Sequence, residues 1–420
     1  MGSGMLDDRL ISSAQLYGTP FYVYDADVIQ RQYDLLRAVL PNQVGILYSV
    51  KANPLMGICQ LLRSWGAGCE VASEGELLIA LETGFQPDSI AFAGPGKTDA
   101  ELRAAIGRKI GCIHVESVDE AILIDRLAAK LGCVPRVALR VNPDLSAGRA
   151  GLRMSGVASP FGIDGTMLDE AIRTVLDLRS VELVGFHVYV GSQFLNAEDI
   201  AGTFRHSIRL ACDTAEKHNF PLLHLDLGGG FGVPYFPQES ELNLELLRSL
   251  LADIWAEFTP RLNVTRVLVE SGRFLLAESG VYVTKVLYRK TSKGNVFLVC
   301  DGGSHHHANS AFLGRAVRGN FPLRIAGKTA DEAQVEEVTV SGRLCTPTDC
   351  LGQGIFLPRA EPGDLVVVEK SGAYGLTNSP IGFLSHPMPA EWLYWQGKLW
   401  PLREAGRPSD AMRGQNKLRL

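Results

Sequence analysis

The amino-acid sequence predicts an α/β protein made of a (β/α)8 barrel and a second, mostly β domain. Eight short apolar segments alternate with helical stretches between residues 45 and 269, and after residue 276 the segments become rich in β-branched residues and turn signals. Polar motifs recur directly after the apolar segments, at the strand ends where barrel enzymes place their active sites. These observations favour a barrel, with a doubly wound open sheet as the alternative.

Each apolar segment is predicted to be a buried strand, because it is rich in Val, Ile and Leu and mostly does not alternate with polar residues. The predicted strands are Gly45–Ser49, Glu70–Ala72, Ile90–Ala93, Cys112–Val115, Val137–Val141, Leu183–Val190, Leu223–Leu227 and Val267–Val269. Helical patterns such as Asp119–Leu131 and Gly202–His218 lie between them. Eight strand–helix units in roughly 230 residues match the size of a (β/α)8 barrel.

The segments after residue 276 predict a second domain. Its β-branched strands are separated by turn signals, and they are Val281–Leu287, Val296–Cys300, Gln334–Val340 and Asp364–Glu369. The earlier strand Phe21–Tyr24 precedes the first barrel unit and can pair with this domain. Because 420 residues are too many for one compact core, we predict a barrel of residues 38–276 and a β domain of residues 1–37 and 277–420.

The composition argues against several classes of partner. With 41 basic and 46 acidic residues the formal net charge is −5, so nothing points to nucleic acid or an anionic membrane. No apolar run is long enough to span a bilayer, and the start MGSGMLDDRLI lacks the basic and apolar segments of a signal peptide. The eight cysteines are scattered without CxxC pairs. We therefore expect a cytoplasmic protein with reduced thiols.

Lys51 directly continues the first predicted strand, in the motif YSVKANP. A lysine at a buried strand end needs a partner for its charge, a route to solvent or a covalent use. A side chain that simply reaches solvent would explain Lys51 on its own. Together with the motifs below, a Schiff-base role becomes the better interpretation.

Glu70 and Glu76 bracket the end of the second predicted strand, in CEVASEGEL. Ser73 followed by Glu76 fits a helix capping box, in which the serine and glutamate side chains bond to each other's backbone N–H groups. On spacing alone, capping is as good an explanation of Glu76 as a place in a functional site.

His187 lies inside an apolar strand in HVYVGSQ, and Tyr189 points to the same face of that strand. A histidine in an apolar strand is usually a core residue whose ring nitrogens are hydrogen-bonded. At the end of a barrel strand, however, the ring of His187 or of Tyr189 can stack on a flat cofactor. Ser192 has a hydroxyl and a glycine neighbour suited to phosphate, although it can equally be a turn residue.

A glycine run follows the seventh predicted strand in LGGGFG, residues 227–232. Consecutive glycines let several backbone N–H groups converge on one anion, and barrel enzymes commonly bind phosphate after strands 7 and 8. Glu270 ends the eighth strand in ESGR, and Arg273 lies near the same rim. If a cofactor with a pyridine ring binds here, a carboxylate at this position can hold the ring nitrogen protonated. A Glu270–Arg273 pair without a catalytic role is the plain alternative.

The β domain carries three further motifs, DGGSHHH at residues 301–307, CTPTD at 345–349 and GAYG at 372–375. The three adjacent histidines do not predict a metal site. Neighbouring residues on a strand point to opposite faces, and no second cluster of ligands accompanies them.

Taken together, the motifs resemble the fold-type III pyridoxal-phosphate (PLP) decarboxylases, the diaminopimelate and ornithine decarboxylase family. YSVKANP, CEVASEGEL, HVYVGSQ, LGGGFG, ESGR, CTPTD and GAYG occur in the order of the family, and the likeness runs from about Phe21 to Trp392. The resemblance implies a PLP-dependent carboxy-lyase in which Lys51 forms the Schiff base, His187 stacks on the ring and Glu270 binds the pyridine nitrogen. It places other side chains around the cofactor and its phosphate: Glu70, Glu76, Ser192, Gly228, Gly229, Gly230, Gly232, Arg273 and Tyr374.

The resemblance also implies a homodimer with shared active sites. In the family, a cysteine contributed by the partner subunit protonates the carbanion after carbon dioxide leaves, and Cys345 matches that cysteine. Asp301 and Asp349 are expected to lie near the substrate.

Several residues depart from the pattern of diaminopimelate decarboxylases. Ser271 stands where those enzymes carry proline, Tyr189 replaces the histidine of their HxGSQ motif, and Phe383–Pro387 replaces a tyrosine-containing substrate segment. These differences resemble a specialised branch of natural-product or siderophore pathways that includes the butirosin-pathway decarboxylase, which acts on an aminoacyl group tethered to an acyl carrier protein. We therefore expect α-decarboxylation of an amino acid or of an aminoacyl derivative, free or carrier-bound.

Three alternatives accompany this expectation. The first is a diaminopimelate decarboxylase that makes lysine. The second is an amino-acid racemase, although racemases of this architecture carry an arginine at the pyridine nitrogen where this chain has Glu270. The third is a non-catalytic regulator on the same scaffold, against which the presence of Lys51, Glu270 and Cys345 argues.

Overall fold

The computed structural model describes residues 3–143, 152–153, 158–262, 264–311, 319–329 and 334–418. The chain forms two compact units. The barrel unit contains Gln30–Pro234 and Glu239–Leu275, and the β unit contains Met1–Ile29, Tyr235–Gln238 and Leu276–Leu420. The limits expected from the sequence differ from these units mainly within the helix at residues 26–39 and at residues 235–238.

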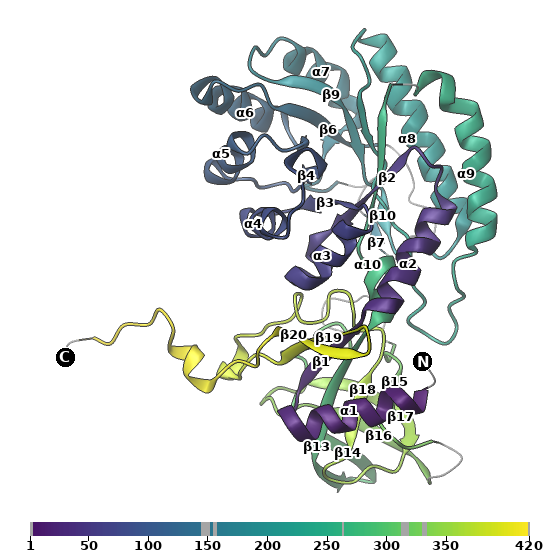
Figure 1. The fold of residues 1–420 in the computed structure, drawn as a ribbon, viewed down its shortest axis with the longest axis vertical. Helices are drawn as coiled ribbons and strands as arrows, with labels where there is room; N and C mark the ends of the chain where they lie inside the picture. The colour runs from purple at the N-terminus through teal and green to yellow at the C-terminus, as the bar shows by residue number, and fades with distance from the viewer. Residues whose placement is uncertain are drawn as a thin grey trace. The chain divides into compact units, whose positions relative to one another are not determined.

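Eight parallel strands of the described chain close into a barrel (Figure 1). In pairing order they are β2 (Val44–Ser49), β3 (Gly68–Val71), β4 (Ile90–Phe92), β5 (Cys112–Val115), β6 (Arg136–Asn142), β9 (Glu182–Val188), β11 (His224–Asp226) and β12 (Arg266–Ser271). Because β12 pairs again with β2, the sheet has no free edge there. The predicted (β/α)8 barrel is confirmed, and the open sheet is excluded.

Helices cover the outside of the barrel (Figure 1). They are α2 (Ala26–Val39), α3 (Met56–Ser64), α4 (Glu74–Glu82), α5 (Asp99–Gly107), α6 (Val118–Leu131), α7 (Leu168–Leu176), α8 (Ala197–Lys217), α9 (Leu244–Phe258) and the short α10 (Arg273–Leu276). The sequence sets several of their starts, because an N-cap side-chain oxygen accepts a backbone N–H of the first turn. Such caps are Ser73, Thr98, Ser117, Asn196 and Asn243.

Short strands complete the barrel unit. β8 (Ile163–Asp164) pairs in parallel with the end of β6, and β10 (Gly191–Ser192) pairs with β7 (Leu152–Arg153) beyond the end of β9. Gly185 sits where β9 meets β11. A Cβ atom there would lie 1.8 Å from the carbonyl oxygen of His224, and the backbone has φ +154°. Close strand pairing at this point therefore requires glycine.

The β unit is built on one mixed sheet in the order β17-β16-β14-β13-β1-β19-β20, with β18 pairing with both β13 and β15. Its helix is α1 (Ser3–Tyr17), and its strands are β1 (Phe21–Asp25), β13 (Gly280–Ser292), β14 (Asn295–Cys300), β15 (Leu323–Ile325), β16 (Val335–Ser341), β17 (Cys350–Pro358), β18 (Leu365–Val368), β19 (Ala390–Trp395) and β20 (Lys398–Arg403). β1 pairs with β13, Phe21 opposite Val283, which confirms the predicted pairing of the early strand. Leu10, Phe21, Val283 and Val367 pack in its core.

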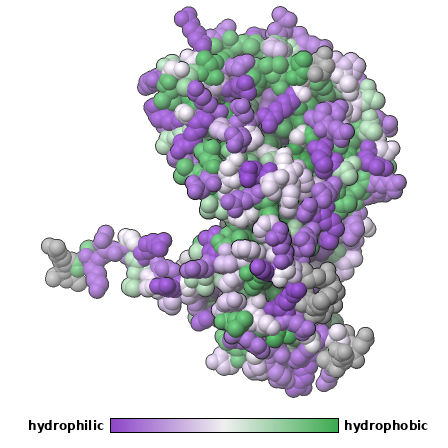
Figure 2. Space-filling view, viewed as in Figure 1, coloured by the Kyte–Doolittle hydropathy of each residue, from purple (hydrophilic) through white to green (hydrophobic). Residues whose placement is uncertain are grey.

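Among the described helices, none is both long and apolar enough to cross a membrane. Figure 2 shows hydrophilic side chains spread over the visible face of the barrel unit. All eight cysteines are free thiols, and Cys345 is the exposed one.

Gly185→Ala tests the close approach of β9 and β11. We expect a loss of about 3 kcal/mol or more in the free energy of unfolding, because the new methyl group collides with a backbone carbonyl that cannot move without opening the barrel. The matched control is Gly202→Ala on α8, an exposed helical position with nothing within 4 Å of the new Cβ. Helix propensity predicts that this control stabilises by about 0.5–1 kcal/mol. Denaturant unfolding monitored by circular dichroism measures the stability of both variants. Equal stabilities of the two variants would contradict the close approach of β9 and β11 at Gly185.

Candidate active site

Lys51 lies in a short 3-10 turn (Val50–Ala52) directly after β2, and its ammonium is paired with Glu70 on β3. The Nζ atom is 3.0 and 2.9 Å from the two carboxylate oxygens of Glu70. The Glu70 side chain is 1% exposed, whereas that of Lys51 is 40% exposed. Burial raises the pKa of Glu70 and the lysine charge opposes that shift. The pair therefore presents an accessible amine beside a carboxylate that readily accepts a proton.

Register places these two residues together. Ser49 at the end of β2 lies opposite Glu70 in the β2–β3 pairing, two residues before Lys51. Gly272, in the turn after β12, packs against Ser49 and Ala52, where a Cβ would lie 3.2 and 2.7 Å from their Cβ atoms. The ESGR and YSVKANP motifs therefore meet at one end of the barrel, as the order of the strands predicted.

Glu270 and His187 face each other inside the barrel. His187 Nε2 lies 3.3 Å from Glu270 Oε1, and both side chains are buried. The angles are not those of a hydrogen bond, since both atoms lack a partner among the described residues. Burial, followed by the charges of Arg140 and Lys51, lowers the pKa of His187 well below its usual value, so the ring is neutral and the contact is not an ion pair.

The burial of His187 bears on which ring lies against the cofactor. His187 is 1% exposed, and the ring of His114 lies 4.3 Å away, centre to centre. Tyr189 is only partly buried and packs against Gly228, whose Cβ would lie 2.7 Å from Tyr189 Cδ2. The ring contact of His187 stays a prediction, and the partial exposure of Tyr189 makes Tyr189 the alternative that the sequence also offered.

The loops carrying Ser192 and the glycine run are joined by hydrogen bonds. Phe194 N donates to Gly230 O at 2.8 Å, and Gly232 N donates to Phe194 O at 2.9 Å. Gly228 N is also committed, to Asp226 Oδ1. The amides of Gly229 and Gly230 are therefore the candidates within this run for contact with a phosphate. Two of the glycines are forced by close packing: a Cβ at Gly229 would lie 1.9 Å from Glu270 O, and Gly230, at φ +97°, abuts Phe194.

Glu76 forms half of the capping box that its spacing suggested: Ser73 caps the helix, but the Glu76 carboxylate bonds to the N–H of Ala72 and not to that of Ser73. Ser73 Oγ accepts the N–H of Glu76 at 3.2 Å, and Glu76 Oε2 accepts the N–H of Ala72 at 2.7 Å. Its place beside a cofactor stays a prediction, as does that of Arg273, which begins α10 next to Gly272.

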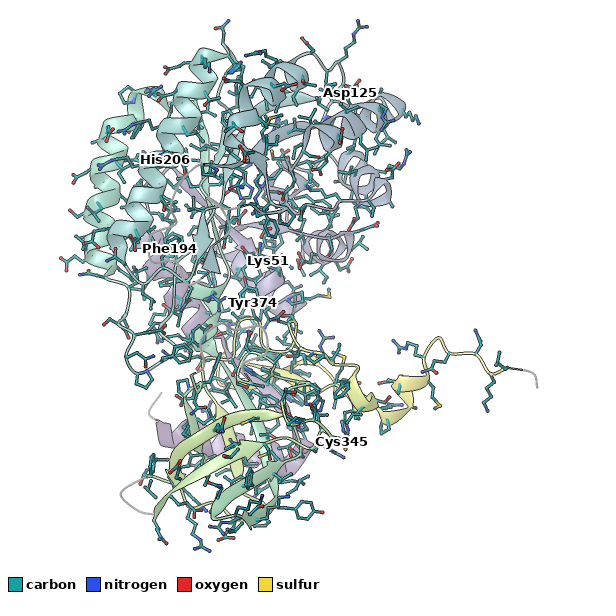
Figure 3. All side chains as sticks on the ribbon, turned by 180° about the vertical axis from the view of Figure 1, so that it is seen from behind. Lys51, Asp125, Phe194, His206, Cys345 and Tyr374 are labelled. Atoms are coloured by element: carbon teal, nitrogen blue, oxygen red, sulfur yellow. The ribbon has the colours of Figure 1, made fainter. Side chains whose placement is uncertain are left out.

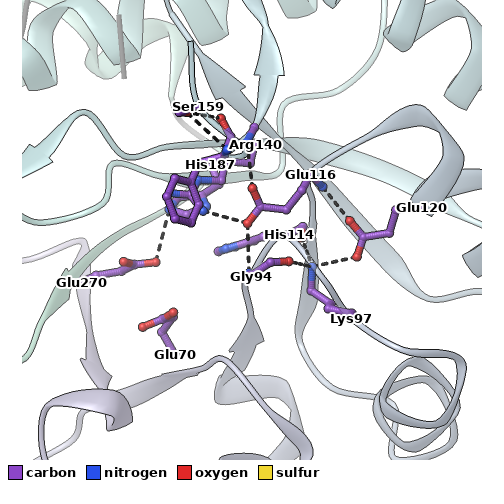
Figure 4. A network of polar contacts seen from close by, with 12 residues as sticks. Glu70, Gly94, Lys97, His114, Glu116, Glu120, Arg140, Ser159, His187 and Glu270 are labelled. Carbon is purple, nitrogen blue, oxygen red and sulfur yellow. Dashed lines mark hydrogen bonds and ion pairs between the residues drawn. The ribbon is translucent and has the colours of Figure 1, made fainter. Parts of the chain in front are cut away.

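A buried ionic network that the sequence did not reveal lies beside these residues (Figure 4). Arg140 Nη1 donates to Glu116 Oε1 at 2.7 Å, and the backbone N–H groups of Gly94 and Gly162 donate to the same carboxylate. Lys97 Nζ bonds to Glu120 and to two backbone carbonyls. The guanidinium of Arg140 also lies over the Phe161 ring. This network links the ends of β4, β5 and β6.

Histidine and carboxylate groups from several strands cluster in the barrel interior. One side-chain atom from each of His114, His187, Asp226 and Glu270 lies within 4.8 Å of the others, and Cys112, His114 and His224 form a second such group. Apolar layers normally fill a barrel of this kind. The sequence signal for these residues was polar alternation within short strands, His114 and Glu116 along one and His224 and Asp226 along another, which we had interpreted only as buried strands.

The β unit contains the other predicted residues, and their position relative to Lys51 stays a prediction. Cys345 lies on an exposed loop before β17 (Figure 3). Asp349 shapes that loop, because its carboxylate accepts the N–H groups of Leu344 and Ser304 at 2.8 and 2.6 Å. Tyr374 has φ +56°, and its carbonyl accepts a hydrogen bond from Asn309.

Asp301 is also engaged inside the β unit. Its Oδ1 accepts bonds from Thr284 Oγ1 and Lys285 N, and its Oδ2 accepts one from Thr19 Oγ1. The adjacent histidines have separate local partners, Pro387 O for His306 and Ser371 Oγ for His307. Contact of Asp301 or Asp349 with a substrate stays a prediction.

A barrel with a lysine at the end of its first strand and a carboxylate at the end of its last defines a class of PLP enzymes. The family profile described as "Pyridoxal-dependent decarboxylase, pyridoxal binding domain" matches residues 26–277. The chain belongs to this family, the fold-type III decarboxylases, and is a PLP-dependent amino-acid decarboxylase.

Individual relatives agree over nearly the whole chain. The L-glutamyl-[BtrI acyl-carrier protein] decarboxylase of Niallia circulans is 43% identical over 402 residues, which cover 95% of this chain and 94% of the relative. The diaminopimelate decarboxylase of Aquifex aeolicus is 29% identical over 392 residues, 93% of this chain and 90% of the relative. Among solved structures, diaminopimelate decarboxylase from Helicobacter pylori complexed with L-lysine has a TM-score of 0.87 at 27% identity and covers 96% of this chain and 98% of its own.

The residues present fit PLP. Glu270 Oε1 is a buried acceptor without a donor in the described part of the chain, as a partner for a protonated ring nitrogen requires. The Lys51 amine is accessible beside a proton acceptor. Phe194, two residues after Ser192, is hydrogen-bonded to the glycine run, so the two loops form one edge suited to a phosphate.

His224→Gln tests the neutral state of the buried histidines. Burial lowers the pKa of His224 to about 3, from about 6.5 in an unfolded chain. The unfolded state therefore binds the extra proton, and stability falls as the pH drops from about 6.5 toward about 3. Between about pH 7.5 and pH 5, the variant should gain about 2 kcal/mol relative to the wild type. Unfolding of the cofactor-free protein at both pH values measures this, and a pH-independent difference would contradict it.

Proposed function

We propose that this decarboxylase removes the α-carboxylate of a glutamyl group that is attached to an acyl carrier protein through its side-chain carboxyl group. The observation that carries the proposal is the 43% identity, over 95% of the chain, to an enzyme whose name specifies such a substrate. The diaminopimelate decarboxylase of Aquifex aeolicus is 29% identical. Free diaminopimelate is the second candidate, because enzymes with that activity share the fold and the family.

The hydrogen bonds of the β unit support the carrier-bound substrate. A free diamino acid carries a second ammonium group, which needs a carboxylate partner in a closed site. The two aspartates that the family resemblance assigns to the substrate each accept at least two hydrogen bonds from their own unit: Asp301 from Thr284 and Lys285, Asp349 from Ser304 and Leu344. A side chain bound through an acyl linkage has no distal charge to pair.

We assign the following roles to the chain's own residues. Lys51 Nζ is the amine that attaches the cofactor, and the Glu70 carboxylate receives the proton that this amine must lose before it reacts. Glu270 holds the ring nitrogen, Tyr189 lies against the ring, and Ser192 with Gly229 and Gly230 binds the phosphate. PLP, when bound, supplies an electron sink for the pair left as carbon dioxide departs.

Cys345 completes the proposal. Its thiol is exposed on a loop whose shape Asp349 fixes through Leu344 N. We place this thiol in the active site of a second copy of the chain, where it returns a proton to the carbon that has lost its carboxylate. The active unit is then a homodimer.

A carbon dioxide release assay tests the substrate class. The expected result is rapid release from L-glutamyl carrier protein, with the turnover of free L-glutamate and free diaminopimelate lower by at least about 100-fold, which corresponds to about 3 kcal/mol of lost binding to the carrier and its arm. The matched control is the same carrier protein without its aminoacyl group. Faster turnover of diaminopimelate would replace the proposal by its second candidate, and racemisation without gas release would refute decarboxylation of these substrates.

Cys345→Ala tests the proton donor. The variant should keep the cofactor absorbance, because the barrel residues hold PLP, and should lose clean formation of the amine product by about 10²–10⁴-fold, the usual contribution of a positioned acid. Cys133→Ala on the barrel unit is the control, since Cys133 belongs to none of the motifs of the site. Unchanged amine formation in Cys345→Ala would remove the thiol from the mechanism.

A further inference from the structure

Asp226 and Glu270 are carboxylates on neighbouring barrel strands that face each other without a donor between them. They are 0% and 3% exposed, and one oxygen of each lies within 4.8 Å of the other. Asp226 Oδ2 and Glu270 Oε1 each lack a hydrogen-bond donor among the described residues. Asp226 Oδ1 accepts the N–H of Gly228 at 2.8 Å, which fixes the carboxyl group and leaves Oδ2 for its neighbour.

The cations around this pair are already committed. Lys51 contacts both carboxylate oxygens of Glu70 at 3.0 and 2.9 Å. Arg140 donates to Glu116 at 2.7 Å, and that carboxylate is 5% exposed. Each positive charge is thus balanced by a carboxylate of its own. Asp226 and Glu270 are left as two buried acids that share the field of these cations but have no partner cation in the described part of the chain.

The neighbouring histidines do not supply positive charge either. His187 on β9 lies 3.3 Å from Glu270, His114 on β5 lies 3.8 Å from Asp226, and His224 on β11 contacts His114 Nε2 at 3.2 Å. Burial is the largest influence on all three rings and lowers each pKa, so they are neutral at pH 7. Two adjacent buried carboxylates without a counter-charge cannot both ionise at ordinary cost.

From this geometry we propose that Asp226 and Glu270 share one proton, carried on Asp226 Oδ2 and donated to the Glu270 carboxylate. Asp226 is a positioning residue: it keeps Glu270 oriented and singly charged toward the cofactor nitrogen. The inference rests on the proposed role of Glu270 at that nitrogen.

The electrostatics agree with this direction of donation. Burial raises the pKa of Asp226 well above its usual value, and the neighbouring Glu270 raises it further. Burial also raises the pKa of Glu270, but the charges of Lys51 and Arg140 oppose that rise. The proton therefore stays on the aspartate, and the glutamate retains the negative charge that a protonated ring nitrogen needs.

Infrared spectroscopy of the cofactor-free protein tests the shared proton directly. The wild type should show the carbonyl band of a protonated carboxylic acid at neutral pH, and the band should shift in D2O. Asp226→Asn should remove it. The matched control is Asp125→Asn on α6, which replaces a carboxylate bonded to Ser180 N outside the barrel interior and should leave the band unchanged. A band that survives in Asp226→Asn overturns the proposal.

Cofactor affinity provides a second readout. Asparagine can still accept from Gly228 N and donate from Nδ2 to Glu270, so Asp226→Asn should keep the Kd for PLP within about threefold, whereas Asp226→Ala should raise it about tenfold or more. An asparagine variant that binds PLP as weakly as the alanine variant overturns the proposal. If Asp226→Ala does not fold, the infrared result for Asp226→Asn decides alone.

The proposed function and the shared proton can each be refuted without the other. A wild-type protein that takes up no PLP refutes the proposed function, yet its infrared band at neutral pH still reports on Asp226. A PLP-loaded enzyme without the band keeps the proposed function and refutes the shared proton.

Discussion

The ion pair between Lys51 and Glu70 is the contact on which the site depends. It needs β2 and β3 paired so that Ser49 lies opposite Glu70, and it needs β12 to return to β2 so that the turn at Gly272 packs against Ser49 and Ala52. A closed barrel meets both conditions at once. The pair holds the amine at the open end of the barrel, while the carboxylate that takes up its proton is buried.

Charge balance organises the rest of the interior. Lys51 is matched by Glu70, and Arg140 by Glu116, each through short contacts. The histidines between them are neutral because burial disfavours the charged ring. What remains is the acid pair of Asp226 and Glu270, and a shared proton leaves it with a single negative charge. The single negative charge of this acid pair balances the one positive charge that a cofactor with a protonated ring nitrogen brings.

Much of the fold and part of the site follow from the sequence. Apolar strands at regular spacing predicted the barrel, and its closure pairs the strand that ends near Glu270 with the strand that precedes Lys51. Arg140 and Asp226 were missed because each lies within or beside a strand of mostly apolar residues, where one inward polar side chain hardly changes the pattern. The choice between His187 and Tyr189 did not follow from the sequence, because strand alternation gives the face of a side chain but not its depth: His187 is buried beside His114, and Tyr189 is the more accessible ring.

The most direct test of this account is the site of cofactor attachment. The PLP-loaded protein is reduced with borohydride and digested, and the modified peptide is located by mass spectrometry. The account predicts a single adduct on Lys51 Nζ, absent from Lys51→Met and retained in Lys130→Met, a change at an exposed helical lysine. An adduct on another lysine, or a colourless protein that takes up no PLP, would contradict it.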